Sequence, residues 1–301
     1  MKRSISIALA AVAALALALC LAGCSQGENY TPQSKAATVQ DSQLVKAGTL
    51  TVGVNASNTP MAGQTSTYVG IDVDIAAAIA DELGLKLSIV DVKTDAAGAL
   101  ENKTVDFVLG YDSTLSSASL WKSDTYLQTG VAFFSTKASA AVPVIGGTSK
   151  FSATASSVSA WAVTNQFGSA SLTSTTDLAS AFSNLEEGLV DYVAADAVIG
   201  MYAAHSEGLD AYIIAMANKP GGYCAAVSSS NTGMQSIVQT ALKTVTSNGM
   251  VNLIEKKWLG TTIALSTLTV TEPPATTTAT TDESTSDDEE SSDDDASSDE
   301  E

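Results

Sequence analysis

The chain has 301 residues, 45% of them hydrophobic, and a formal net charge of −19. This length is sufficient for one or two domains with a substantial core. Residues 25–270 contain twenty acidic residues and twelve lysines. No basic patch is therefore available for phosphates, and nucleic-acid binding is not expected.

The first 24 residues have the pattern of an export signal. Lys2 and Arg3 precede an apolar run over residues 5–21, and small residues follow. This order is typical of a secretory signal, with an uncleaved membrane anchor as the alternative. The ending Leu-Ala-Gly-Cys resembles the bacterial lipobox, which implies that Cys24 is lipidated and becomes the first residue of the mature protein.

A strand followed by a helix opens the globular part. Apolar residues alternate over residues 49–55, which predicts a strand, and then recur at helical spacing up to Gly84. We expect a polar loop between the two elements, with Asp72 or Asp74 capping the helix. Loops at the carboxyl ends of strands are where open α/β sheets bind ligands.

The pattern then alternates between strands and helices, which predicts a parallel α/β unit. We expect a strand at residues 85–92, a helix at 95–101, a strand at 105–109 and a strand at 131–135 that leaves this unit. The stretch up to residue 157 is rich in Ser, Ala and Gly and has little periodicity. We therefore place a crossover into a second unit near Lys137.

The second unit repeats the alternation. We expect a strand at residues 161–163 that leads to Gly168 and Ser169, a helix at 177–187, a strand at 190–194 and a helix that begins at Asp196. The chain then returns through a strand around Tyr223, and two helices end at Gly260.

Five short segments follow one another in a recognisable order. They are GTLTVGV at residues 48–54, GIDVDIA at 70–76, VDFVLG at 105–110, SDTY at 123–126 and the stretch from NG to KKWLG at 248–260. They resemble the extracytoplasmic solute-binding proteins of ABC importers, family 3, which take up polar amino acids. The resemblance implies an α/β, two-lobed periplasmic-binding-protein-like fold of type II, with two crossover hinges and a ligand cleft between the lobes.

With this resemblance the chain divides into six parts. These are a signal peptide (1–23), a lipidated tether (24–44), the first part of lobe 1 (45–136), lobe 2 (137–222), the return to lobe 1 (223–262) and a disordered acidic tail (263–301). Residues 271–301 contain thirteen acidic residues and no Lys or Arg, a composition that buries too little apolar surface to fold. The tail is interpreted as a solvated spacer, with weak cation binding or contact with basic surfaces as alternatives.

The resemblance also implies how an amino acid is held in the second lobe. Asp196 falls on the carboxylate that pairs with the ligand's ammonium group, and a charge-assisted bond in a closed cleft is strong. Capping of the following helix is its alternative or additional role. Gly168 and Ser169 match a loop whose backbone N–H groups receive the ligand's carboxylate at a helix start, with an ordinary turn as the alternative.

In the first lobe, Ser113 matches a hydroxyl that bonds the ligand, and Asn55 matches a polar contact at the end of the first strand. Tyr111 and Asp112 are unusual additions beside Ser113. The family's usual aromatic positions fall on Asn58 and Lys93.

The family's carboxylate-binding arginine is missing, since the only arginine in the chain is Arg3. A lysine cannot reproduce the planar two-bond fork of a guanidinium group. Three explanations are open. Lys93 or Lys122 supplies a point charge, or the ligand has no α-carboxylate and Asp112 with Asp196 favours an amine, or transport binding has been lost.

Enzymatic chemistry, a metal and a cofactor are not expected. The lone histidine, His205, lies at a predicted helix end, where it complements the helix dipole, and Cys224 is interpreted as a small buried residue. The chain lacks a zinc-ligand cluster, a Gly-x-Ser-x-Gly elbow and a Gly-x-x-x-x-Gly-Lys phosphate loop. Trp161 and Trp258 are expected in the core or between the lobes.

Two hypotheses about function follow. The first is a lipid-anchored component of an ABC importer that captures a small polar solute, an amino acid or an amine, between closing lobes and delivers it to a membrane permease. The second is a surface sensor or interaction protein that keeps the fold but has lost the amino-acid ligand. Either would be a monomer held by its lipid on the extracytoplasmic face of the cell membrane.

Overall fold

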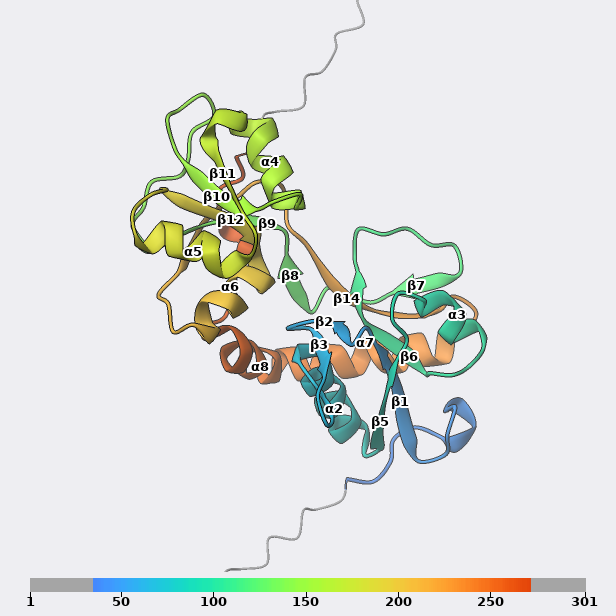
Figure 1. The fold of residues 1–301 in the computed structure, drawn as a ribbon. Coiled ribbons are helices and arrows are strands. Elements are labelled where there is room, and N and C mark those ends of the chain that lie inside the picture. The colour runs from blue at the N-terminus through green and yellow to red at the C-terminus, as the bar shows by residue number, and fades with distance from the viewer. Residues whose placement is uncertain (1–34, 272–301) are drawn as a thin grey trace, which may run out of the picture.

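Two sheets with helices packed against them form two lobes (Figure 1). The computed structural model describes residues 35–271. The first lobe contains β1 (Thr49–Val54), β5 (Lys86–Asp91), β6 (Phe107–Asp112), β7 (Leu120–Lys122), β8 (Leu127–Thr129), β14 (Gly221–Ser228), α2 (Ile71–Leu83), α3 (Ala96–Glu101), α7 (Thr232–Ser247) and α8 (Met250–Leu259). The second contains β9 (Val131–Ser135), β10 (Phe151–Thr154), β11 (Leu172–Thr175), β12 (Tyr192–Asp196), β13 (Tyr212–Met216), α4 (Val158–Phe167), α5 (Leu178–Glu186) and α6 (Ala197–Ser206). The predicted two-lobed α/β fold is confirmed.

The two sheets have matching strand orders. The first runs β5-β1-β6-β14-β7, with β8 beside β14, and the second runs β11-β10-β12-β9-β13. In each sheet the first three strands are parallel, and the fourth, which has just crossed from the other lobe, is antiparallel to the third. The carboxyl ends of the three parallel strands therefore meet at one edge of each sheet.

The crossover lies earlier than the sequence predicted. Because β8 pairs in the first sheet and β9 in the second, the chain changes lobe at Gly130 rather than near Lys137. The apolar run of β9 predicts a buried strand but does not reveal which sheet it joins. The return passes through residues 217–220, between β13 and β14.

A small sheet replaces the polar loop predicted between β1 and α2. Strands β2 (Ser57–Asn58), β3 (Ala62–Gln64) and β4 (Tyr68–Val69) pair there in an antiparallel manner. Helix α2 follows without a side-chain cap, so the predicted capping by Asp72 or Asp74 is wrong. The backbone oxygens of Pro60 and Met61 already accept from the first N–H groups of the helix, which leaves both carboxylates free for other partners.

The strand predicted at residues 161–163 is wrong, because these residues lie in helix α4. The side chain of Ser157 caps this helix by accepting from the backbone N–H of Ala160. The strand lies upstream, at β10, in the stretch that has little periodicity. A short apolar triplet is compatible with either element, so the capping serine is the better signal.

The hydrophobic core runs through both lobes. One cluster of buried side chains joins Val52 and Ile75 of the first lobe with Phe134 and Met216 of the second. Leu265 belongs to the same cluster and is only 1% exposed. Residues 263–271 are therefore part of the described fold, although the sequence predicted that a disordered tail begins at residue 263.

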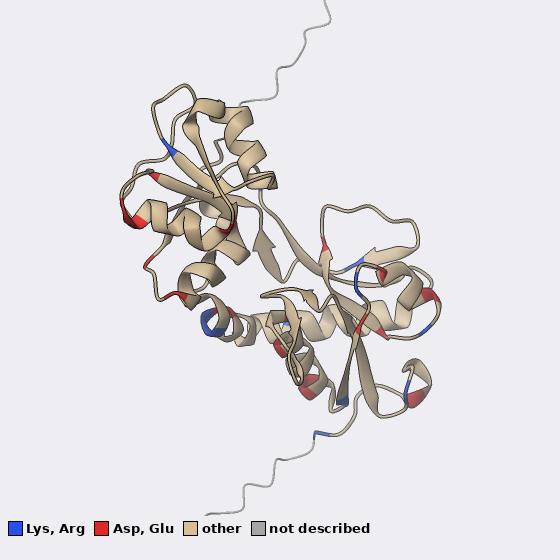
Figure 2. Cartoon of the chain, in the orientation of Figure 1, with Lys and Arg blue, Asp and Glu red and all other residues tan. Residues whose placement is uncertain are grey.

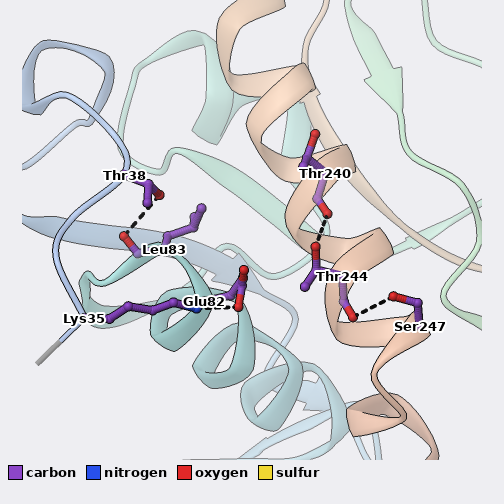
Figure 3. A network of polar contacts seen from close by, with 7 residues as sticks. All are labelled: Lys35, Thr38, Glu82, Leu83, Thr240, Thr244 and Ser247. Carbon is purple, nitrogen blue, oxygen red and sulfur yellow. Dashed lines mark hydrogen bonds and ion pairs between the residues drawn. The ribbon is translucent and has the colours of Figure 1, made fainter. Parts of the chain in front are cut away.

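The N-terminal segment lies against the end of α2 (Figure 3). Lys35 forms an ion pair of 2.6 Å with Glu82, and the backbone N–H of Thr38 donates to the Leu83 carbonyl at 3.0 Å. Gly84 ends the helix in the left-handed conformation, as the sequence predicted. Lys35 and Thr38, which belong to the tether predicted at residues 24–44, therefore pack against the end of a core helix.

Candidate functional site

Asp196 lies where the two lobes meet. It is the last residue of β12 and the cap of α6, and its Oδ1 accepts from the backbone N–H groups of Val198 and Ile199 at 3.0 Å each. Its Oδ2 accepts from the Thr129 hydroxyl of β8, in the first lobe, at 2.7 Å. The predicted capping role is confirmed, and a hinge residue additionally orients the carboxylate.

The surroundings of Asp196 disfavour its charged form. Burial raises its pKa, the hydrogen bonds from Thr129 and the helix start counteract the rise, and the charge of Asp112 adds to it. Burial and the charge of Asp196 likewise raise the pKa of Tyr223, on β14. Carboxylates of both lobes therefore share one electrostatic environment with a tyrosine of the return strand.

The end of β6 separates two predicted site residues. Gly110 has a left-handed backbone, and the pairing with β14 shifts register there, as in a β-bulge. Tyr111 packs with the cluster beneath α3, whereas Asp112 lies opposite Tyr223. We therefore group Asp112, but not Tyr111, with Tyr223 and Asp196.

The neighbouring loops hold the other predicted residues of the first lobe. The backbone N–H of Ser113 donates to the Gly222 carbonyl at 2.8 Å, which continues the strand pairing. The Asn55 side chain accepts from the N–H of Ser57 and shapes the loop after β1. The Asn58 side chain moderates the raised pKa of Tyr223. Sequence reasoning missed Tyr223 as a site residue, although its strand was predicted.

A buried pair lies behind this site and connects two of the family-like segments. The Tyr126 hydroxyl donates to Asp72 Oδ1 and accepts from the N–H of Gly110 at 2.8 Å. Asp72 is 1% exposed, and burial raises its pKa to about 7, against the lowering effect of the Tyr126 hydrogen bond. The pair fixes the start of α2 against β6, which carries Asp112.

Gly168 and Ser169 lie away from Asp196. Gly168 ends α4, and Ser169 begins a 3-10 turn that enters the amino end of β11. Asp196, in contrast, stands at the carboxyl ends of the parallel strands. The sequence placed a strand where α4 lies, so the loop that was predicted to receive a ligand carboxylate lies at the end of this helix and not at its start. Ser156 and Ser157 follow the carboxyl end of β10 and precede α4, so they lie at the same edge of the sheet as Asp196. The backbone φ of Ser156 is 58°.

No arginine lies in the part of the chain that the structure describes, and Figure 2 shows the few basic residues scattered over both lobes. The Lys122 ammonium group donates to the carbonyls of Ser113 and Leu115 at 2.6 and 2.7 Å. Lys122 thus braces the loop that follows β6. Lys93 is exposed, with φ of 53°, and no polar contact joins its ammonium group to Asp112 or Asp196 within residues 35–271.

Four further sequence predictions have a clear outcome. Cys224 is fully buried, and its thiol donates to the Tyr111 carbonyl. His205 lies in the last turn of α6, as predicted. Trp258 lies between the lobes, bonded to Asp74 and packed near Tyr202. Trp161 is 67% exposed, so its predicted place in the core or between the lobes is wrong.

A separate groove of about 890 Å³ runs along α5 and α6 and reaches Thr59 of the first lobe. None of the predicted site residues lines it. Among residues 35–271, His, Cys, Asp and Glu form no group that could hold a metal ion, and no helix there is long and apolar enough to cross a membrane. Cys24 and most of the acidic tail lie outside the described residues.

Comparison with known proteins agrees with this architecture. Residues 50–261 match the family model of bacterial extracellular solute-binding proteins, family 3. The chain belongs to this family, whose members bind solutes outside the cytoplasm. A search of curated protein sequences found no match.

Solved structures share the fold at low sequence identity. A polar amino acid ABC uptake transporter substrate-binding protein from Streptococcus thermophilus has a TM-score of 0.66 and 18% identity over 75% of this chain and 91% of its own. The unliganded, open L-cystine solute receptor of Neisseria gonorrhoeae has a TM-score of 0.61 and 19% identity, over 72% of this chain and 94% of its own. An ancestral cationic amino acid solute-binding protein has a TM-score of 0.60 and 22% identity, over 73% of this chain and 100% of its own.

Proposed function

We propose that this protein is the solute-binding component of an ABC importer. It captures a small polar solute between its lobes and delivers it to a membrane permease, without chemical change of the solute. The observation that carries the proposal is the position of Asp196 at the junction of the lobes, together with the family. A lipid on Cys24 would hold the protein, as a monomer, at the extracytoplasmic face of the membrane.

The charges around the site favour a ligand with an amino group. Asp112 and Asp196 offer two carboxylates, and Lys122 is engaged by backbone carbonyls. A ligand ammonium group would compensate the burial of Asp196 by a charge-assisted bond. Amino acids and simple amines both satisfy this condition, and the missing arginine removes the family's usual reason to prefer a carboxylate.

A surface sensor or interaction protein is the second candidate. The same missing arginine favours it, and Lys122 is engaged by the carbonyls of Ser113 and Leu115 instead of being free for a ligand carboxylate. Such a protein would keep the two lobes without a transported solute.

A thermal-shift screen of amino acids, polyamines and other small amines tests the proposal. A ligand at about one hundred times its dissociation constant should stabilise the protein by about 2.7 kcal/mol, which raises the melting temperature by about 5–10 °C for a chain of this size. No shift with any compound, from a folded sample, would favour the second candidate.

The test of the site is Asp196→Asn, which keeps a capping side chain and removes the charge. We expect this variant to fold and to lose the ligand-induced shift. Asp177→Asn is the matched control, because Asp177 caps α5 in the same way. A shift that survives in Asp196→Asn, or that also disappears in Asp177→Asn, would contradict the assigned role of Asp196.

A further inference from the structure

Residues 261–271 make a connection between the lobes that neither hinge strand provides. After α8 ends in the first lobe, this segment, which we call the strap, passes the hinge and reaches the sheet of the second lobe. The backbone N–H of Ile263 donates to Glu255 of α8 at 3.1 Å, and that of Ser266 donates to the Gln128 side chain of β8 at 3.2 Å. The first half of the strap is thus fixed to the first lobe.

The end of the strap pairs with the second lobe. Val270 forms a parallel bridge with Met216, the last residue of β13. The Met216 N–H donates to the Thr269 carbonyl, and the Thr271 N–H donates to the Met216 carbonyl, both at 2.9 Å. The Thr271 hydroxyl donates to Gln166 of α4 at 2.7 Å. Because β13 is the edge strand of its sheet, the strap also covers unpaired backbone groups there.

The middle of the strap is anchored by burial. Leu265 is 1% exposed and packs in the cluster that spans both lobes. The segment is therefore held at both ends and at its centre.

We propose that the strap is a third connection that limits how far the lobes can rotate apart. Its spare length is small, because the only compact part is the 3-10 turn at Leu265–Thr267. Unwinding these three residues from about 2 Å to about 3.3 Å of rise per residue would release about 4 Å. Larger opening must break the contacts at Met216 or at Gln128. This inference does not depend on the ligand or on transport.

The distance between the lobes measures this restraint directly. Spin labels at Glu101→Cys on α3 and Glu186→Cys on α5 report it in ligand-free protein, with Cys224→Ala to remove the buried thiol. Three chains are compared: residues 25–301, 25–271 without the acidic tail, and 25–262 without tail and strap. We expect the first two to give the same narrow distance distribution, and the third to give a broader one that extends to separations several ångströms longer.

A point variant keeps the test decisive if residues 25–262 do not fold. Thr271→Pro removes the N–H that donates to Met216 and the hydroxyl that donates to Gln166, and it leaves Leu265 in place. We expect it to broaden the distribution, and Thr271→Val, which keeps the N–H, to broaden it less. A distribution in Thr271→Pro that equals that of the unmodified chain would overturn the proposal.

Discussion

Two aspartates show how surroundings change one chemical role. Asp177 and Asp196 both cap helices with their side chains. Hydrogen bonds from Ser180 and Thr176 lower the pKa of Asp177, which lies in solvent. Burial raises the pKa of Asp196, so the carboxylate that caps α6 is in surroundings that disfavour its charged form. A ligand cation would remove that cost, and we expect binding of an amine to weaken as the pH falls through the pKa of Asp196.

Asp72 should make stability depend on pH. Its pKa is raised from an ordinary value of 3.8 to about 7 in the folded chain, so the folded state holds the proton more tightly than the unfolded state. The contribution is fully present below about pH 4, and is lost as the pH rises toward 7, at about 1.4 kcal/mol per pH unit at most. Asp72→Asn should flatten this slope while it still accepts from Tyr126, as measured by urea unfolding at several pH values.

Asp177→Asn is the control for the sign of the pH dependence of stability. Because the pKa of Asp177 is lowered, its contribution is present at neutral pH and is lost as the pH falls. Removal of Asp177 should therefore change the pH slope in the opposite direction. An Asp72→Asn protein with the unmodified slope would show that the buried carboxyl group is not the source.

At the scale of elements, the end of α2 depends on the N-terminal segment. Gly84 has φ of 70°, and a Cβ there would stand 2.6 Å from the backbone oxygens of Lys35 and Ala36. Gly84→Ala should cost about 1–2 kcal/mol for the left-handed backbone, and more because the segment must move. Chemical denaturation measures the loss.

Gly208 offers a matched substitution. It follows α6 with φ of 70°, and a Cβ there would meet nothing within 4 Å. Gly208→Ala should show the cost of the backbone alone, so the difference between the two variants gives the contribution of the segment at residues 35–38. Equal costs would mean that this segment contributes nothing to the end of α2.

Sequence reasoning was most accurate where one element carries its own signals. The alternation in β1, and the apolar spacing of α2 with Gly84 behind it, predicted elements that the structure confirms. It failed where the decisive interaction is distant. The sheet that β9 joins, the partners of Asp72 and the docking of residues 263–271 depend on contacts between segments far apart in the chain, and the stretch around β10 and α4 lacked a strong local pattern.

The candidate site was predicted in part for the same reason. Asp196, Asp112 and Asn55 stand at the carboxyl ends of strands, which local patterns locate. Gly168 and Ser169 were assigned through a predicted strand whose residues lie in α4, so they stand at the end of that helix, away from Asp196. Thr129 and Tyr223 could be assigned only from the pairing of the hinge strands, which joins residues from opposite halves of the sequence.

At the scale of the molecule, the shared core should make the lobes unfold together. Helix α8 packs against α2 through Lys257 and Trp258, which both bond Asp74, and against α6 through Tyr202. Gly260 also lies against His205 of α6. We expect one thermal transition, with the calorimetric enthalpy equal to the van't Hoff enthalpy. Two separated transitions would show that the lobes are independently stable.

The position of Trp258 gives the protein a natural optical signal. Its indole ring donates to Asp74 on one lobe and lies 6.3 Å from the Tyr202 ring on the other, whereas Trp161 is exposed to water on α4. Movement of the lobes would change the environment of Trp258 and leave that of Trp161 as it is. Intrinsic fluorescence should therefore follow opening and closing in real time, without any attached label.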